Sequence, residues 1–381
     1  MAHIFEGIRV IDLTSNLAGP ITTAMLADFG AEVIKVEKPV FGDDSRAWPV
    51  QIGGASSLFV HANRGKKSIV LDFKKEADID ILRKLIAKSD VLIESFRPGV
   101  MSKFNLSYDE VCKLNKSIIM CSISVCGQTG PYRDRPGYDL IAQAMSGVMD
   151  ITGNPDGPPM RLGPAVADNT TAYHAFGGIS AALYHRIRTG EGQFIDLSLF
   201  ECMTMQIDCF ELASAGKVVT RNGNHSNMLT PYGVFGKKTG GMMIGALNPK
   251  LWRILTSLMG RPEFENDPKY VTVAKRLENQ RELIPIIDEW VDTFGDLNKL
   301  EELLMKNNIP CARVRTVNEV VDDPHLNERE TLVEVDVPFS KIMPKIKVRG
   351  VAIKFSKTPG KPGRPPALGQ HQEEVLKLIS E

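Results

Sequence analysis

Hydrophobic positions in the first half of the chain switch between short β-branched runs and longer stretches with helical spacing. Residues 8–13 form one such run. Apolar residues at Ile21, Met25, Leu26 and Phe29 follow with the spacing of a helix, and residues 31–37 form the next run. The same pattern predicts further strands at 67–72, 90–94, 118–124 and 193–199, with a helix at 76–88. Strands that alternate with helices predict a largely parallel sheet covered on both faces.

Ligands of such sheets bind beyond the carboxyl ends of the strands. The loops that follow the predicted strands, at 14–20, 38–46, 95–103 and 125–138, are therefore the expected binding region. The turn after the first strand lacks the GxGxxG pattern of dinucleotide-binding proteins, and the chain holds neither GxSxG nor HExxH. Dinucleotide-dependent dehydrogenases, serine hydrolases and zinc proteases therefore lack motif support.

The pattern changes after residue 223. Two short strands are expected at 234–235 and 242–246, followed by amphipathic helices at 250–259, 283–294 and 298–306. A chain of 381 residues also exceeds one typical hydrophobic core. We therefore expect an α/β fold with two domains. Residues 1–199 form a large domain that 343–381 complete, 200–223 and 326–342 are linkers, and 224–325 form a smaller α+β domain.

The charge balance excludes several classes of partner. Lysine plus arginine and aspartate plus glutamate both total 46, which gives a formal net charge of zero. This argues against nucleic acid or an anionic membrane surface as principal partner. The six cysteines show no metal-binding spacing, no apolar run approaches 18 residues, and the first residues lack the features of a secretion signal. We expect a soluble cytoplasmic protein without a metal site.

Residues 162–190 contain the most informative stretch. Gly163 and Pro164 interrupt the chain, and Asp168 then stands at the expected start of a helix that continues to Gly190. The helix dipole favours an ionised carboxylate at this position at neutral pH. Such an acid is suited to capping the helix or to acting as a nucleophile. The small residues that follow, including Gly177 and Gly178, cost about 1 kcal/mol each relative to alanine and predict a close backbone approach.

Cationic side chains recur in the loops at the predicted sheet edge. These are Lys38, Arg46, Arg97, Lys103, Arg133 and Arg135. If they converge, they suit a polyphosphate ligand; if they do not, they are solvated surface groups. The residues by themselves leave this choice open and do not name a reaction.

A series of motifs spans the chain in order. They include residues 10–20 (VIDLTSNLAGP), 30–37 (GAEVIKVE), 42–46 (GDDSR), 94–99 (ESFRPG), 127–131 (GQTGP), 135–143 (RPGYDLIAQ) and 323–326 (DPHL). In these motifs the chain resembles the class III CoA-transferases, the family of formyl-CoA:oxalate and carnitine CoA-transferases. The resemblance implies a Rossmann-like large domain, a smaller domain and an interlocked, ring-like homodimer.

The resemblance also implies a mechanism. Asp168 is expected to form an anhydride with the donor acyl group and then a thioester with coenzyme A. Coenzyme A and acyl-CoA are thus substrates, and no tightly bound cofactor is expected. The implied CoA contacts are Ala18, Lys38, Leu71, Ser95, Phe96 and Lys103, to which the cation pattern adds Arg97. Lys38 and Lys103 replace arginines of the formyl-CoA enzyme, and Ser95 replaces an asparagine.

The implied acid site differs from that of the oxalate enzyme. Leu17 replaces a glutamine, and the loop 225–230 holds no glycine where that enzyme has a mobile tetraglycine loop. Leu17, Tyr138 and Met228 are expected to line a less polar pocket. The sequence does not identify the donor and acceptor acids.

Two other functions are compatible with parts of this pattern. A 2-methylacyl-CoA racemase carries histidine where this chain has Tyr138. Tyrosine, with an ordinary pKa near 10, is a poor base at neutral pH, which favours the transferase. A non-catalytic CoA-binding protein is the other alternative, and the presence of Asp168 argues against it.

Overall fold

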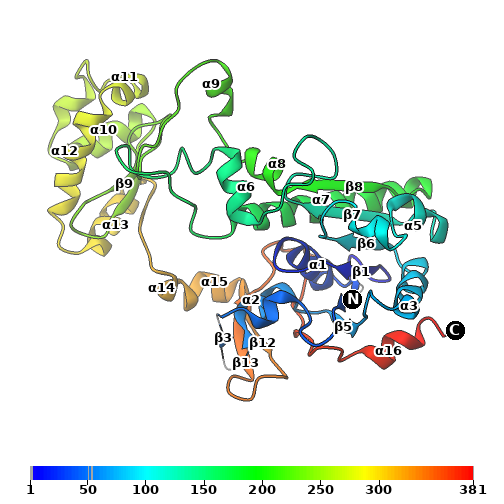
Figure 1. The fold of residues 1–381 in the computed structure, drawn as a ribbon. Coiled ribbons are helices and arrows are strands. Elements are labelled where there is room, and N and C mark those ends of the chain that lie inside the picture. Colours follow the sequence, from blue (N-terminus) through cyan, green and yellow to red (C-terminus); the bar gives the residue numbers. More distant parts are fainter. Residues whose placement is uncertain (1–2, 50, 53–54, 381) are drawn as a thin grey trace. The chain divides into compact units, whose positions relative to one another are not determined.

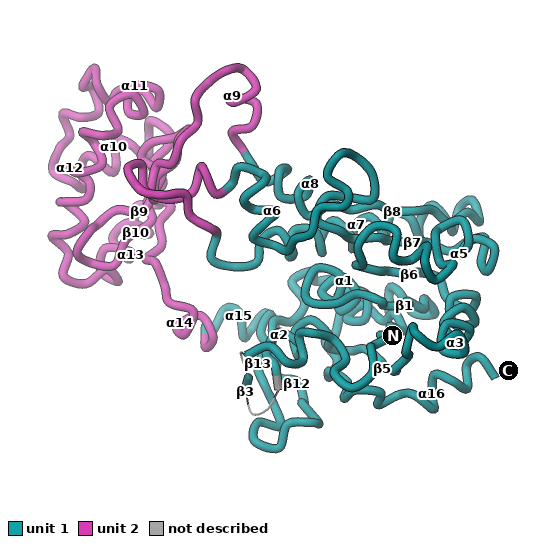
Figure 2. Tube along the Cα trace, viewed as in Figure 1, with its two compact units in different colours: residues 1–148, 162–207, 323–381 teal, residues 149–161, 208–322 magenta. Residues whose placement is uncertain are grey.

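The computed structural model describes residues 3–49, 51–52 and 55–380. Residues 1–2, 50, 53–54 and 381, which belong to the predicted large domain and its C-terminal part, lie outside the described residues. The chain divides into two compact units, shown in Figure 2. Unit 1 comprises 1–148, 162–207 and 323–381, and unit 2 comprises 149–161 and 208–322. Within the described ranges, no helix combines the length and apolar character that a membrane span requires.

Unit 1 is built on a six-stranded sheet in which all neighbouring strands are parallel (Figure 1). The spatial order is β5 (Lys67–Val70), β2 (Glu32–Glu37), β1 (Arg9–Leu13), β6 (Val91–Glu94), β7 (Ile119–Ser124) and β8 (Phe194–Ser198). The predicted Rossmann-like parallel sheet is confirmed. The order reverses direction between β1 and β6, which makes the carboxyl ends of these two strands the expected ligand crevice.

Helices cover both faces of this sheet. Residues Ile11, Ile34 and Leu92 on one face share a hydrophobic core with α3 (Glu76–Ala87), α5 (Tyr108–Leu114) and α16 (Gln372–Lys377). The alternate residue of β1, Asp12, accepts a 2.7 Å hydrogen bond from Thr23 of α1 (Ala18–Asp28) on the other face. Helix α7 (Val166–Thr189) packs against α1: the Thr22 hydroxyl of α1 lies 3.4 Å from the carbonyl oxygen of Ala172 in α7.

The C-terminal part of the chain belongs to unit 1. Strands β12 (Leu332–Asp336) and β13 (Lys345–Arg349) form an antiparallel pair whose Val335 and Val348 pack on Val60 of α2 (Ser57–Ala62). Gly369 N donates to Ser68 Oγ at 3.0 Å, which fixes the tail to the edge strand β5. The remaining described elements of unit 1 are the short 3-10 helix η1 (Asp44–Ala47), β3 (Gln51–Ile52), β4 (Ala55–Ser56), α4 (Val100–Lys103), α6 (Asp139–Ser146), α8 (Leu199–Thr204) and α15 (Pro324–Glu328).

Unit 2 has its own sheet and core. Strands β11 (Cys311–Arg313), β10 (Met242–Gly245) and β9 (Tyr232–Phe235) are antiparallel, and Phe235, Ile244 and Trp252 belong to its core. Its helices include α9 (Phe210–Ser214), α10 (Pro249–Leu258), α11 (Val273–Glu278), α12 (Gln280–Asp292), α13 (Leu297–Lys306) and α14 (Val317–Val321). The segment 149–161, outside the predicted small domain, joins this unit because Arg221 donates to the backbone and carboxylate oxygens of Asp150, both at 2.8 Å.

Candidate active site

Asp168 lies in the first turn of α7, as the third helical residue. The N-cap position is Ala165, which has no side chain able to cap, so the expected N-cap role of Asp168 is wrong. The predicted end of the helix is confirmed, because Gly190 is the C-cap residue with a left-handed φ of 79°. Asp168 therefore lies at the start of the helix, but its carboxyl group does not serve as the cap of α7.

Asp139, the first residue of α6, supplies the missing cap. Its Oδ1 accepts a 3.2 Å hydrogen bond from the backbone N–H of Asp168. Its Oδ2 accepts a 2.7 Å bond from Gln143 Nε2, and Gln143 Oε1 accepts a 3.0 Å bond from the backbone N–H of Leu162. Asp139 is only 8% exposed. The start of α7 is thus held by a neighbouring helix, and the Asp168 carboxyl is left available for chemistry.

The electrostatics of Asp168 differ from those predicted. Burial, and secondly the negative charge of Asp139, raise the pKa of Asp168 to about 7. The expectation that Asp168 is ionised at neutral pH therefore holds only in part, because a pKa near 7 leaves the carboxyl partly protonated at that pH. A less strongly solvated carboxylate is also the more reactive nucleophile once it is ionised.

The loop that precedes Leu17 is fixed by buried charges. Lys35 Nζ donates to the backbone oxygen of Thr14 at 2.9 Å and pairs with Asp43 Oδ2 at 2.7 Å. Asp43 Oδ1 in turn accepts from the backbone N–H of Asn16 at 3.3 Å, and Asn16 adopts a left-handed φ of 72°. Asparagine tolerates this conformation better than most residues. Lys35 and Asp43 are both nearly inaccessible to solvent, so they set the loop rigidly.

Leu17 reaches the start of α7 from this loop. It shares a hydrophobic cluster with Ile21, Ala62 and Ala172, against which Ala165 packs. Since Ala165 and Ala172 lie on either side of Asp168 in the sequence, the structure brings Leu17 to the same part of α7. Tyr138, directly before Asp139, is 74% exposed. Unit 1 therefore gathers Asp168, Leu17 and Tyr138, whereas Met228 belongs to unit 2.

The predicted CoA contacts surround the reversal point of the sheet. Ala18 is the first residue of α1, after β1, and Ser95 follows β6. The Ser95 hydroxyl accepts a 3.1 Å hydrogen bond from the backbone N–H of Ser15, which joins the two loops. Phe96 stacks edge-to-face on Phe73, with ring centroids 6.3 Å apart. Leu71 is buried in the core beneath them.

The cations at this edge do not act alike. Arg46 makes two 2.7 Å bonds to the carboxylate of Glu37 and lies 3.8 Å above the Phe59 ring, so it is a structural residue. Lys38 pairs with Asp44 at the surface. Arg97 and Lys103 are exposed and, within the part of the chain that the structure describes, have no ion-pair partner. Together with Arg135, which is also exposed and in no ion pair among the described residues, these two are the cations most available for a phosphate.

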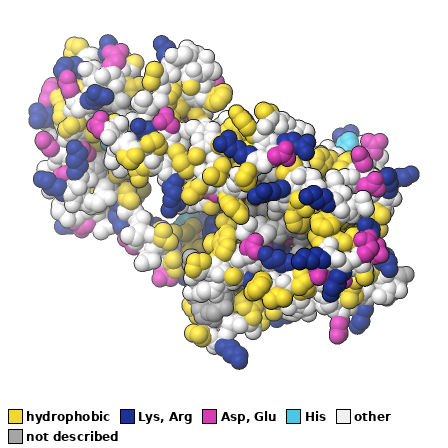
Figure 3. Space-filling model, viewed as in Figure 1, with side chains coloured by type: hydrophobic (Ala, Val, Ile, Leu, Met, Phe, Trp, Pro, Cys, Tyr) yellow, Lys and Arg dark blue, Asp and Glu magenta, His cyan; other side chains and the backbone are white. Residues whose placement is uncertain are grey.

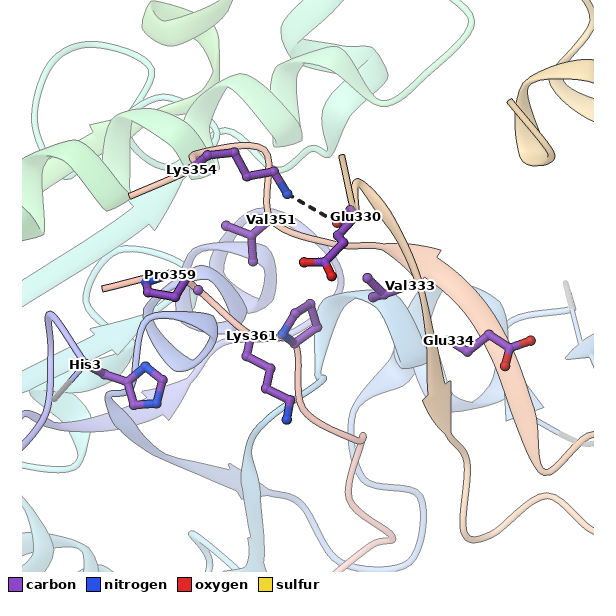
Figure 4. Close-up of a pocket in the computed structure, with 10 residues that line it drawn as sticks. His3, Glu330, Val333, Glu334, Val351, Lys354, Pro359 and Lys361 are labelled. Carbon is purple, nitrogen blue, oxygen red and sulfur yellow. Dashed lines mark hydrogen bonds between the residues drawn. The ribbon is translucent and has the colours of Figure 1, made fainter. Parts of the chain in front are cut away.

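On the face drawn in Figure 3, no continuous basic area stands out. In the view of Figure 3, lysine and arginine side chains are interspersed with acidic and hydrophobic ones over both units. A cavity of about 570 Å³ elsewhere in unit 1 is lined by charges of both signs, among them Glu330, Lys354 and Lys361 (Figure 4). None of the predicted site residues lines it. This cavity is therefore separate from the candidate active site.

The expected close backbone approach along α7 is only partly present. It occurs at Ala172, where α1 contacts the helix backbone. At Gly177, however, an added Cβ would meet no described atom within 4 Å, and at Gly178 it would make an ordinary 3.7 Å contact with Ile195. Packing within unit 1 does not account for the two glycines.

The match to known proteins covers the chain almost completely. The model of CoA-transferase family III matches residues 5–372. The chain belongs to this family. The predicted resemblance is confirmed, and with it the prediction of an acyl-CoA:carboxylate CoA-transferase.

Individual relatives agree with this assignment. The chain is 38% identical to succinyl-CoA:glutarate CoA-transferase of Mus musculus over 98% of this chain and 86% of that one. It is 37% identical to succinyl-CoA:mesaconate CoA-transferase of Haloarcula hispanica over 97% and 95% of the two chains. The crystal structure of a CAIB/BAIF family protein from Brucella suis matches with a TM-score of 0.86, 33% identity and full coverage of both chains.

Sequence reasoning missed two residues at this site. Asp139 and Gln143 belong to the motif 135–143, but the motif by itself indicates no role for them. Their spacing of four residues places them on one face of a helix, which was the available signal. That the face points at the start of α7 could not be read from the sequence, because α6 and α7 are separated by a long irregular segment.

Proposed function

We propose that this family III enzyme transfers CoA by covalent catalysis through Asp168. The Asp168 carboxylate attacks the thioester carbonyl of the donor. The C–S bond breaks, CoA leaves as a thiolate, and a mixed anhydride of Asp168 and the donor acid remains. The thiolate then attacks the aspartyl carbonyl, which releases the donor acid and leaves an aspartyl-CoA thioester. The acceptor carboxylate and the returning thiolate repeat these two steps in reverse and regenerate Asp168.

The observation that carries this proposal is the position of Asp168. It lies in the first turn of α7 with its backbone N–H bound by Asp139 and its own carboxyl free of a capping bond. A carboxylate whose pKa is raised toward 7 is still ionised in a large fraction of molecules at neutral pH, and it is a stronger nucleophile than a carboxylate with an ordinary pKa. Arg97 and Lys103 would hold the phosphates of CoA at the crevice between β1 and β6.

We propose succinyl-CoA as donor and a short dicarboxylic acid as acceptor. The support is the names of the two relatives above, whose acceptors are glutarate and mesaconate. In this chain Leu17 would face the acyl part, beside Asp168, and favour the methylene or methyl groups of such acids over oxalate. We keep Met228 and the loop 225–230 in the proposal as residues that would line the acid pocket.

We further propose that the enzyme works as a cytoplasmic homodimer, interlocked as the resemblance implies. Large apolar side chains lie along one exposed side of α7, with Tyr173 57%, Tyr184 63% and Ile187 80% exposed. Gly177 lies between them at helical spacing and opens to free space among the described residues. A second copy packed closely on this side would account for both features. All six cysteines are free thiols, as in a reducing compartment.

An exchange assay tests the proposed reaction. Purified enzyme receives succinyl-CoA together with a panel of dicarboxylic acids, and new acyl-CoA species are separated by chromatography. Asp168→Ala is expected to abolish exchange while CoA still binds. Asp109→Ala is the matched control, because Asp109 is an exposed acid in the first turn of another helix, α5. Turnover of Asp168→Ala within about tenfold of wild type would contradict the nucleophile, since tenfold is only about 1.4 kcal/mol of barrier.

A further inference from the structure

Glu94 is a buried acid at the centre of unit 1 that the proposed mechanism does not use. It is the last residue of β6, and its parallel-sheet neighbours are Leu13 of β1 and Ser122 of β7. Its side chain lies at the reversal point of the sheet and is 2% exposed. The next residues, Ser95, Phe96 and Arg97, are expected CoA contacts. Glu94 therefore lies directly beneath the loop that is expected to bind the nucleotide.

The contacts of Glu94 point into that loop. Its Oε2 accepts a 2.7 Å hydrogen bond from the backbone N–H of Phe96, two residues ahead. The Ser122 side chain lies near the same carboxyl group and, like the Phe96 N–H, favours its ionised form. Among the described residues no lysine or arginine pairs with it, and Asp196 on β8 is a nearby like charge. A buried acid without a cation is unfavourable, so the hydrogen bond to the turn is its evident compensation.

The turn that Glu94 holds positions three neighbours. Ser95 is directed to the backbone N–H of Ser15, in the loop that leads to Leu17. Phe96 is directed onto the ring of Phe73, two residues after Leu71. Arg97 is left at the surface. Without an acceptor at position 94, the half-buried Phe96 N–H would lose this partner and the turn would lose its constraint.

We propose that Glu94 is a positioning residue that fixes the Ser95–Arg97 turn for the CoA moiety, by accepting the backbone hydrogen bond of Phe96. This inference rests on the proposed function, because it takes the loop after β6 to be the CoA site. It predicts an effect on CoA binding that is separate from the chemistry at Asp168. A general loss of stability would not show that separation.

The test compares three variants by calorimetric CoA binding and by steady-state kinetics. Glu94→Ala removes the acceptor and is expected to raise the Kd for CoA and the KM for acyl-CoA about tenfold, with kcat and the KM for the acid within about threefold of wild type. Glu94→Gln keeps an acceptor oxygen of the same reach and is expected to restore CoA binding to within about threefold. If Glu94→Ala does not fold, Glu94→Met removes the same acceptor while filling the same volume, and carries the same expectation.

Asp90→Ala is the matched control. Asp90 directly precedes β6, at the opposite end of the strand, and its carboxylate also accepts a 2.7 Å backbone hydrogen bond, from Arg9. Its loss is expected to lower the midpoint of thermal unfolding without changing the Kd for CoA. Wild-type CoA affinity in Glu94→Ala, or equal weakening in Asp90→Ala, would overturn the proposal. Failure of the wild type to bind CoA would instead contradict the proposed function.

Discussion

The protonation of Asp168 offers the sharpest test of the site's electrostatics. Its pKa is raised from 3.8 to about 7, firstly by burial and secondly by the charge of Asp139. This difference of about 3 corresponds to about 4 kcal/mol. Because burial is the larger of the two causes, Asp139 accounts for less than half of it. Asp139→Asn is therefore expected to lower the pKa of Asp168 by up to about 1.5, and not to its ordinary value.

The substitution keeps one of the two Asp139 hydrogen bonds and gives up the other, because the new amide NH2 would face the Gln143 Nε2 donor. An asparagine oxygen can still accept from the backbone N–H of Asp168, so the cap on α7 can persist without the charge. At pH 6 the ionised fraction of Asp168 would rise from about one tenth to as much as about three quarters. At pH 6, the fraction of its own high-pH plateau activity that Asp139→Asn retains is thus expected to be several-fold larger than the fraction that the wild type retains.

The assay is the pH dependence of kcat/KM for acyl-CoA, which reports the pKa of the free enzyme. Activity of the wild type is expected to rise with pH through about 7, because the nucleophile is the ionised form. In Asp139→Asn the same rise is expected at lower pH. Asp134→Asn removes an exposed acid from the preceding loop and is expected to leave the profile unchanged. An acid limb near pH 4 in wild type, or one that does not move in Asp139→Asn, would refute the reasoning.

Three further predictions follow from the same structure. Asp168→Asn is expected to increase the free energy of unfolding at pH 8 by about 1–2 kcal/mol, after allowance for solvent screening. The reason is that a carboxyl whose pKa is raised in the folded state destabilises that state as the pH rises from 3.8 to 7. Guanidinium unfolding at pH 8 and at pH 4 measures this gain, which is expected to disappear at pH 4. Gly177→Leu is expected to shift the proposed dimer toward monomer in size-exclusion chromatography with light scattering. A dimer that the substitution leaves unchanged would exclude this side of α7 as the interface. Lys103→Ala is expected to raise the KM for acyl-CoA about fivefold without changing the KM for the acid, whereas Lys113→Ala, at a lysine paired with Glu110, should alter neither.

The parallel sheet was predictable because its strands are buried runs of β-branched residues separated by helical spacing. The hydrophobic pattern placed β1, β2 and β6 within about one residue of where they lie. Helix α6 was not predicted, since its eight residues follow a loop rich in glycine and proline and carry a short apolar pattern. Its role in capping α7 depends on tertiary packing, which no local signal encodes.

The chemistry of the site was predictable only in part. The motifs identified Asp168, but helical propensity and the dipole suggested a cap and an ionised acid. In the structure Asp139 binds the helix start instead, and burial together with the charge of Asp139 raises the pKa of Asp168; the contact with Asp139 exists only because α6 meets α7. The sequence suggested Arg46 as a phosphate-binding cation, but in the structure it pairs with Glu37 and lies over the Phe59 ring. Glu94 stands at the end of a predicted strand and opens the motif 94–99, but neither feature indicates its hydrogen bond to the Phe96 backbone.

The central claim is that Asp168 carries the acyl group and then CoA. The most direct measurement incubates the enzyme with succinyl-CoA and no acceptor, quenches with hydroxylamine and analyses the peptides by mass spectrometry. We expect a hydroxamate on the peptide that contains Asp168, and none in Asp168→Ala. Unmodified Asp168 together with uptake of solvent deuterium at the α-carbon of the acyl group would contradict covalent transfer and indicate proton-transfer chemistry instead.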